Sequence, residues 1–277
     1  MSLNRRVAPW AGLILILGGV YARILTELVR DWIHDPNYSH GFLIPVVSAV
    51  LVWRGRVTRR DLPRVPSNWG LLGVLIAAGM LILGSAAAEV FTQRVSVILL
   101  LASIVVFLMG WRWLRALAFP IAFLLLAIPM PYVIYYGLTS PLQAFAAKCA
   151  IAGLKVIGVP AMAEGNIIHL QGTSLEVAEA CSGIRSLYAF LALGALLAYS
   201  MNISFWGRLL VFSLTIPLSV AANAFRVWGS GLGAQIIGPQ AAQGTLHELF
   251  GLIVFAGALG VLLLLRWGVR RLWSSAR

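Results

Sequence analysis

The sequence predicts an all-α polytopic membrane protein, and three observations lead to that fold class. Of the 277 residues, 60% are hydrophobic and only 11% are charged, whereas a soluble domain has roughly 45–50% apolar residues. The apolar residues gather in runs close to the length of a membrane-crossing helix, which is about 20 residues. The charge between the runs is mostly positive, with a net charge of +12, as cytoplasmic loops of membrane proteins are. We therefore predict one integral membrane domain over residues 1–277.

About eight apolar runs qualify as transmembrane helices. They cover Trp10–Val29, His40–Trp53, Gly70–Ala88, Val95–Gly110, Trp113–Ile128, Ile184–Tyr199, Leu209–Phe225 and Leu249–Leu265. The second run is short for a crossing, so it must recruit neighbouring residues or thin the bilayer. The first run follows Arg5 and Arg6 as in a signal peptide. No small-residue cleavage site ends it, so we predict an uncleaved anchor.

Residues 131–180, between the fifth and sixth runs, differ from the rest of the chain. Residues 132–157 follow a pair of prolines and contain few charges, which predicts an interfacial helix interrupted at Pro141. From Ala161 to Ala180, β-branched and polar residues alternate, which predicts a small hairpin.

The positive charges predict the orientation of this domain. Most of the 21 Lys and Arg residues fall between alternate runs, at Arg5, Arg6, Arg54, Arg56, Arg59, Arg60, Arg64, Arg112, Arg115, Arg208, Arg266, Arg270, Arg271 and Arg277. The positive-inside rule then places both termini in the cytoplasm. The interfacial helix, the hairpin and the titratable residues that follow them are predicted on the outer face.

Cys181, in the stretch EACSGIRSL, is the candidate nucleophile. An apolar helix is predicted to begin directly after it, with Ser182 as the expected cap. A helix N-terminus and a nearby cation, here Arg185, both favour the reactive thiolate. The simpler interpretation is a small buried residue with Arg185 as an interfacial anchor. The other cysteine, Cys149, lies among alanines and is predicted to pack in the protein; a disulfide between the two is the remaining alternative.

Arg226 and His247 are the expected partners of the thiol. An arginine at membrane depth is costly unless it is paired or functional, and Arg226 could stabilise a thiolate or an oxyanion. Alternatively, it could reach the interface at the end of its helix. His247, at the start of the last run, supplies a proton acceptor with a pKa near neutrality. His40 is a second candidate for the base, and Gly229–Gly233 reads as a turn after the seventh run.

Three short blocks resemble the exosortase/archaeosortase family of membrane cysteine transpeptidases: Cys181 in EACSGIRSL, Arg226 in NAFRV and His247 in HELFG. The loop Tyr38–Gly41 is also similar to the N-terminal block of that family. The resemblance implies that Cys181, Arg226 and His247 form the catalytic set, with the histidine typical of bacterial exosortases. Tyr38, His40, Glu179, Arg185 and Asn223 are the expected supporting or substrate-binding residues.

The resemblance also implies the reaction and its partners. The substrates would be membrane-anchored proteins with a C-terminal PEP-CTERM-type sorting signal, cleaved and transferred at the periplasmic face of the bacterial inner membrane. The alternatives are a non-enzymatic transporter or a scaffold for exopolysaccharide assembly, and an acyltransferase that uses the same thiol. No residue pattern calls for a metal or an organic cofactor. The basic residues follow the membrane loops, so no nucleic acid partner is expected.

Overall fold

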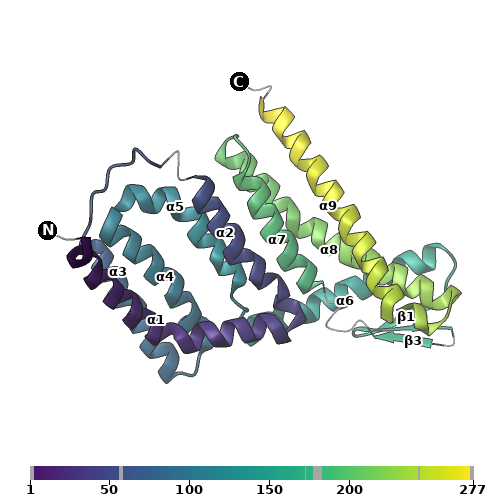
Figure 1. Ribbon diagram of the computed structural model, residues 1–277. Coiled ribbons are helices and arrows are strands. Elements are labelled where there is room, and N and C mark those ends of the chain that lie inside the picture. The colour runs from purple at the N-terminus through teal and green to yellow at the C-terminus, as the bar shows by residue number, and fades with distance from the viewer. Residues whose placement is uncertain (1–2, 56–58, 172, 177–182, 243, 275–277) are drawn as a thin grey trace. The chain divides into compact units, whose positions relative to one another are not determined.

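The computed structural model describes residues 3–55, 59–171, 173–176, 183–242 and 244–274. Within these ranges most of the chain is helical, with one small sheet (Figure 1). The predicted all-α class is therefore confirmed. The chain forms two compact units, Met1–Pro131 and Tyr132–Arg277, and each is described by itself.

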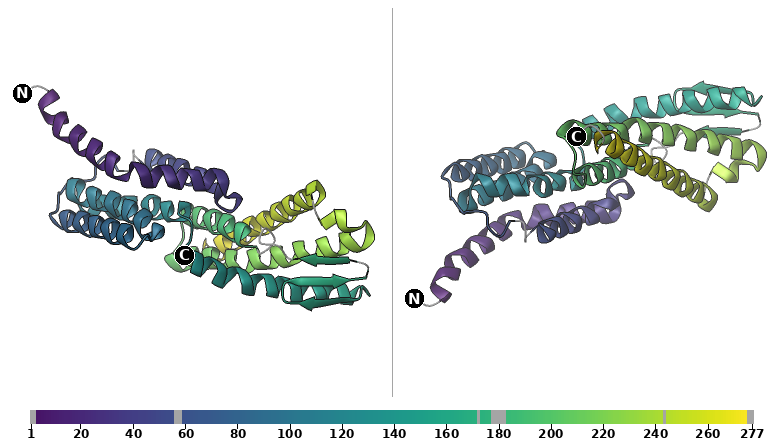
Figure 2. Two further views of the ribbon diagram at one scale, coloured as in Figure 1. Left: turned by 90° about the horizontal axis from the view of Figure 1, so that it is seen from below. Right: turned by 90° about the horizontal axis from the view of Figure 1, so that it is seen from above.

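The first unit consists of α-helices and short 3-10 helices, which are labelled η. Its elements are α1 (Leu3–His34), η1 (Pro36–Phe42), α2 (Leu43–Arg54), α3 (Trp69–Ala86), α4 (Val90–Met109), α5 (Trp111–Phe123) and η2 (Leu124–Ala127). Helices α3 and α4 run side by side (Figure 2). They approach closely because Gly70 and Gly73 of α3 leave room for Phe107 and Ser103 of α4, as small residues do between membrane helices.

Polar contacts join α1 to α4 beside a small apolar core. Tyr21 of α1 is buried against Leu100 of α4, and its hydroxyl lies 3.1 Å from the hydroxyl of Ser96. Arg94 of α4 donates to the carboxylate of Asp31 of α1 at 2.7 Å, and the arginine side chain is only 5% exposed. A buried guanidinium requires such a partner, so this ion pair fixes the two helices to each other.

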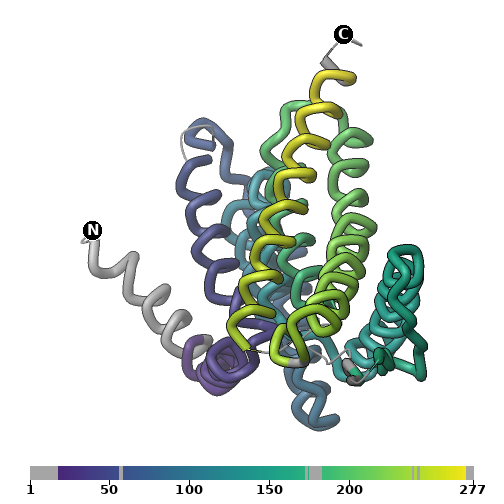
Figure 3. The backbone as a smooth tube through the Cα atoms, turned by 90° about the vertical axis from the view of Figure 1, so that its right-hand side faces the viewer, coloured from purple at the N-terminus to yellow at the C-terminus, as the bar shows by residue number. Residues whose placement is uncertain are grey.

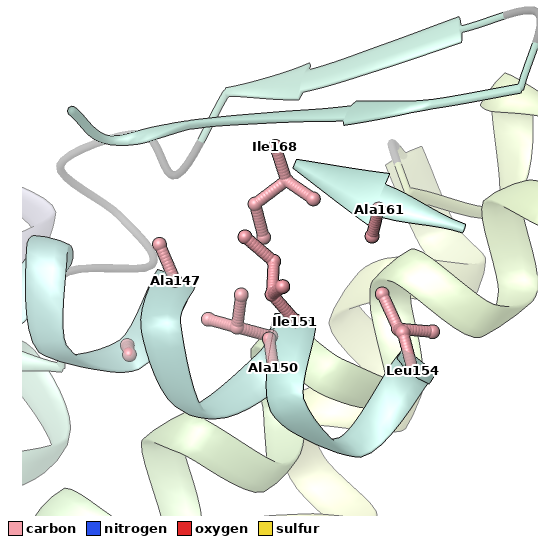
Figure 4. Close-up of a cluster of buried hydrophobic side chains, with 8 residues drawn as sticks. Ala147, Ala150, Ile151, Leu154, Ala161 and Ile168 are labelled. Atoms are coloured by element: carbon pink, nitrogen blue, oxygen red, sulfur yellow. The ribbon is translucent and has the colours of Figure 1, made fainter. Parts of the chain in front are cut away.

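The described residues of the second unit form four α-helices, one short 3-10 helix and a three-stranded sheet. Its elements are α6 (Tyr132–Val156), β1 (Ala161–Glu164), β2 (Ile167–Leu170), β3 (Thr173–Glu176), α7 (Ile184–Tyr199), α8 (Phe205–Ile236), η4 (Pro239–Ala242) and α9 (Gly244–Ser274). The strands form an antiparallel meander in the order β1-β2-β3. Ile168 and Ala161 point from the sheet toward Ala147, Ile151 and Leu154 of α6 (Figure 4), so the sheet is packed on that helix.

Helices α7, α8 and α9 pack against one another, and α8 runs beside α9 (Figures 1 and 3). Small residues again permit close contact. A methyl group at Gly194 of α7 would come within 2.1 Å of the Thr215 side chain of α8, and one at Gly229 of α8 would come within 2.2 Å of the Phe250 ring of α9. The three helices therefore meet with little intervening volume.

Four of the described helices are long and apolar enough to cross a membrane: α3, α4, α8 and α9. A fifth crossing is counted if the segments Trp111–Ala127 and Tyr132–Val156 are taken together as one broken span. Helix α7 is apolar but shorter. The chain is thus a multi-pass membrane protein, while the full set of eight crossings stays a prediction.

The structure differs from the sequence-based expectations at three places. Helix α6 continues through Pro141 instead of being interrupted there, because one proline removes only one of the many backbone hydrogen bonds of a 25-residue helix. The predicted hairpin has an additional strand, β1. The segment Gly229–Gly233 is not a turn but part of the continuous helix α8.

Candidate active site

His247 lies between two polar side chains of the neighbouring helix. It stands in the first turn of α9, and its Nε2 accepts a hydrogen bond from Nη2 of Arg226 in α8 at 2.9 Å. On the other side of the ring, Nδ1 lies 3.1 Å from the hydroxyl of Ser230. Residues 226 and 230 are four apart in a continuous helix, so they share one face and can hold the same ring. The structure therefore joins two predicted site residues and adds a third.

Arg226 lies within α8, not at its end. The helix continues ten residues further, to Ile236, so the alternative that placed Arg226 at the end of its helix is wrong. Gly251 of α9 faces the guanidinium, and a Cβ atom there would come within 2.8 Å of Arg226 Nε. The missing side chain at position 251 thus gives the arginine its space beside α9.

The start of α7 is held against α8 next to Arg226. The residue at the N-cap is Gly183, one position later than the predicted Ser182, and its φ of 82° lies in the left-handed region that favours glycine. A Cβ atom at Gly183 would lie 2.7 Å from Cγ of Asn223, whose side chain is buried. Because Asn223 precedes Arg226 by about one helical turn, the N-terminus of α7 lies at the height of the arginine.

A pocket of about 220 Å³ opens beside this cluster. Its polar lining comes from Arg185, Ser186, Asn223 and Arg226, and its apolar lining includes Phe190 and Phe255. The two rings also contact each other, with centroids 4.9 Å apart. A pocket that combines guanidinium groups with apolar walls fits a ligand that carries a polar or negatively charged group on an apolar body.

The remaining predicted site residues do not all fall in this unit. Tyr38 and His40 belong to η1 of the first unit, where Tyr38 is buried and the two rings are 6.5 Å apart. Trp32 lies over the adjacent Gly41, where a Cβ atom would come within 2.3 Å of the indole ring. Cys181 and Glu179, and with them the alternative disulfide, lie outside the described residues.

Ser230 and Gly251 are the site-forming residues that the sequence did not single out. A serine or glycine in an apolar run is common in membrane helices, so residue type alone gave no signal. The spacing was the available signal, because Ser230 follows Arg226 by four residues and would share its helix face. That spacing carries meaning only if α8 continues past Arg226.

Cys149, in α6, is half-buried. No three His, Cys, Asp or Glu side chains among the described residues are grouped to hold a metal ion.

The fold and the cluster define a multi-pass membrane protein with a polar site between its transmembrane helices. The chain belongs to the transmembrane exosortase family, whose sequence profile matches residues 32–264. That match covers most of the chain and includes the Arg226–His247 pair. No match was found among curated proteins or among solved structures.

Proposed function

We propose that this exosortase is a membrane-embedded cysteine protease and transpeptidase. Its substrates are proteins anchored by a C-terminal signal of the PEP-CTERM type: a short motif, a transmembrane helix and a basic tail. The observation that carries the proposal is the hydrogen bond between Arg226 and His247. It joins a permanent cation and a titratable ring, the two groups that a thiol nucleophile needs beside it.

In the proposed reaction, Cys181 is the nucleophile. Its sulfur attacks the scissile carbonyl and its proton passes to His247. Arg226 stabilises the thiolate and then the oxyanion of the tetrahedral intermediate, because a guanidinium aimed at developing charge lowers the barrier most in a water-poor site. His247 returns the proton to the leaving amine, and an acceptor amine or water then resolves the thioester.

The contact between Gly183 and Asn223 supports the assignment of Cys181. Gly183 belongs to the same sequence block, EACSGIRSL, as Cys181. It lies against Asn223, about one helical turn before Arg226. Arg185 and the apolar pocket would receive the substrate segment that is attacked by Cys181.

The proposed membrane arrangement completes the assignment. The chain crosses the bacterial inner membrane about eight times, with both termini in the cytoplasm and the site at the periplasmic face. The match to a transmembrane family and the apolar helices support a multi-pass protein, and the distribution of arginines favours this orientation. A substrate helix could then enter from the bilayer, so that its extended segment meets Cys181 where it leaves the membrane.

The test is to trap the acyl-enzyme. The protein is co-expressed with a membrane-anchored reporter that carries a PEP-CTERM-type signal, and covalent adducts are sought in the wild type and in Cys181→Ala, Arg226→Ala and His247→Gln. Cys149→Ala serves as the matched cysteine control. We expect a thiol-labile adduct that requires Cys181 and not Cys149, and processing that falls by about 10²–10³-fold without Arg226.

If the protein is a non-enzymatic transporter or scaffold, processing of the reporter should not depend on Cys181. The Cys181→Ala variant would then process the reporter as the wild type does, or neither would process it while both are folded and inserted. Either result would refute the peptidase assignment.

A further inference from the structure

We propose that Ser230 is a positioning residue: it holds the His247 ring as the tautomer that carries its proton on Nδ1, so that Nε2 is the proton-accepting nitrogen. The bearing of this inference on catalysis rests on the proposed function. The tautomer itself rests only on the hydrogen bonds at the ring, and it can be measured without a substrate.

The tautomer follows from the chemistry of the arginine. A guanidinium group has five N–H donors and no acceptor, so in the 2.9 Å contact between Arg226 Nη2 and His247 Nε2 the nitrogen Nε2 must accept. A neutral imidazole that accepts at Nε2 carries its proton on Nδ1. That proton is then donated to the Ser230 hydroxyl, whose oxygen lies 3.1 Å away. The roles of both ring nitrogens are thus assigned: Nε2 accepts from Arg226, which can only donate, and Nδ1 donates to Ser230, which is able to accept.

Ser230 is well placed to impose this state. Its side chain is 6% exposed. It lies inside α8, one helical turn beyond Arg226 and before the helix ends at Ile236. The two contacts come from a single rigid helix, so they fix the ring orientation and the ring proton together. An apolar residue at position 230 would remove this acceptor from the Nδ1 proton, and the loss of that hydrogen bond weakens the preference for the tautomer that carries it.

The tautomer has a consequence for the proposed reaction. The lone pair on Nε2 can hold either the Arg226 donor or a proton, but not both. When the thiol proton moves to Nε2, the ring becomes an imidazolium with two N–H donors, and the bond from Arg226 is lost. The guanidinium, which lines the pocket, is then available to the oxyanion. When the carbon–nitrogen bond breaks and the leaving amine takes the proton from Nε2, the Arg226 bond can form again.

The experiment combines a spectroscopic readout with kinetics on the full-length protein. Nitrogen-15 histidine labelling reports the protonated and unprotonated ring nitrogens, and His247→Gln identifies the signals of that residue among the four histidines. The variants are Ser230→Ala, which removes the hydroxyl, and Ser230→Thr, which retains it. Ser219→Ala is the matched control, because Ser219 is a buried serine of α8 whose hydroxyl has no hydrogen-bond partner among the described residues.

We expect the wild type, Ser230→Thr and Ser219→Ala to show a protonated Nδ1 and an unprotonated Nε2. Ser230→Ala should lose that pattern and lower kcat about tenfold at unchanged KM, as the loss of one hydrogen bond predicts. An unchanged His247 tautomer in Ser230→Ala overturns the inference, whatever the activity. A tautomer that shifts as expected in a protein that processes no substrate supports the role of Ser230 and counts against the proposed function alone.

Discussion

Gly251 and Arg226 approach each other so closely that no side chain fits between them. A Cβ atom at position 251 would come within 2.8 Å of Nε, 3.0 Å of Cζ and 3.1 Å of Nη2 of the arginine. The same guanidinium donates to His247, which lies one turn before Gly251 in α9. His247 and Gly251 of α9 thus define the position of Arg226 together: His247 accepts its hydrogen bond, and Gly251 leaves room for the guanidinium.

Gly251→Ala is therefore expected to impair catalysis while the protein still folds. The added methyl group must push the guanidinium away from His247, and a displacement of about 1 Å in a catalytic group can cost about 10²-fold in rate. Processing of a tagged reporter measures the loss. Gly257→Ala is the control, because a Cβ at Gly257 of the same helix meets nothing within 4 Å; equal activity of the two variants would contradict the prediction.

Gly183→Ala is expected to destabilise the start of α7 for two reasons. The left-handed backbone at φ 82° costs a residue with a side chain about 1–2 kcal/mol, and the contact with Asn223 adds an overpacking cost of about 1–3 kcal/mol. Gly158→Ala separates the two costs, because Gly158 has a φ of 81° and open space around it. Thermal unfolding in detergent should rank Gly183→Ala below Gly158→Ala, and the reverse order would exclude the Asn223 contact as a cause.

The ion pair between Asp31 and Arg94 gives a prediction for the first unit. Asp31→Ala leaves a buried guanidinium without its carboxylate and should destabilise the unit by about 1–3 kcal/mol. The Asp31→Ala, Arg94→Leu double variant should recover most of that loss, because an apolar pair needs no compensation. Chemical unfolding of the single and double variants measures the coupling, and additive losses would show that the pair does not stabilise the unit.

Glu89 gives a pH-dependent prediction outside the membrane helices. It caps α4, where its carboxylate accepts hydrogen bonds from the backbone N–H groups of Thr92 and Phe91 at 2.6 and 3.0 Å. Burial raises the pKa of Glu89, but the bonds from Thr92 and Phe91 together outweigh it, so the pKa lies below its ordinary value. A carboxyl of this kind stabilises the fold above its unfolded pKa of about 4.3, and this contribution is lost as the pH falls through the lower folded pKa.

The Glu89→Gln variant should therefore be less stable than the wild type at pH 7, by about 0.5–1 kcal/mol for a weakened cap. The difference should shrink as the pH falls below about 4, where both side chains are neutral. Melting temperatures measured by circular dichroism from pH 7 to pH 3 test this. A difference that stays constant across that range would show that the charge of Glu89 does not contribute.

The sequence predicted the helical class because hydropathy reports directly which segments can cross a bilayer. Strand β1 escaped detection, since AMAE (Ala161–Glu164) lacks the β-branched residues that indicate strands. The continuation of α8 escaped as well, because Gly229, Gly231 and Gly233 read as a turn. Phe250 fills the space over Gly229, so packing between α8 and α9 overrides the low helix propensity of glycine.

Arg226 and His247 were each predicted as site residues, but the hydrogen bond between them was not. Arg226 and His247 are conspicuous because charged and titratable groups are rare in apolar helices. Their hydrogen bond depends on the rotation of α8 against α9, which hydropathy does not encode. The role of Ser230 depends on the same rotation. The catalytic roles of Arg226, His247 and Cys181 stay predictions until the variants are tested.

If the chain cleaves anchored substrates as proposed, the unbroken length of α8 bears on which bond is cut. At about 1.5 Å per residue, the helix carries Arg226 roughly 30 Å from its first residue, which is close to the thickness of the hydrocarbon core of a bilayer. A flexible loop would let the catalytic groups rise and sink relative to the lipid, whereas a continuous helix keeps them at one height. Such a helix would hold the site at a fixed height, so an anchored substrate would be cut at a set distance above the membrane. The length of the substrate's own anchor helix would then decide which peptide bond lies at that height.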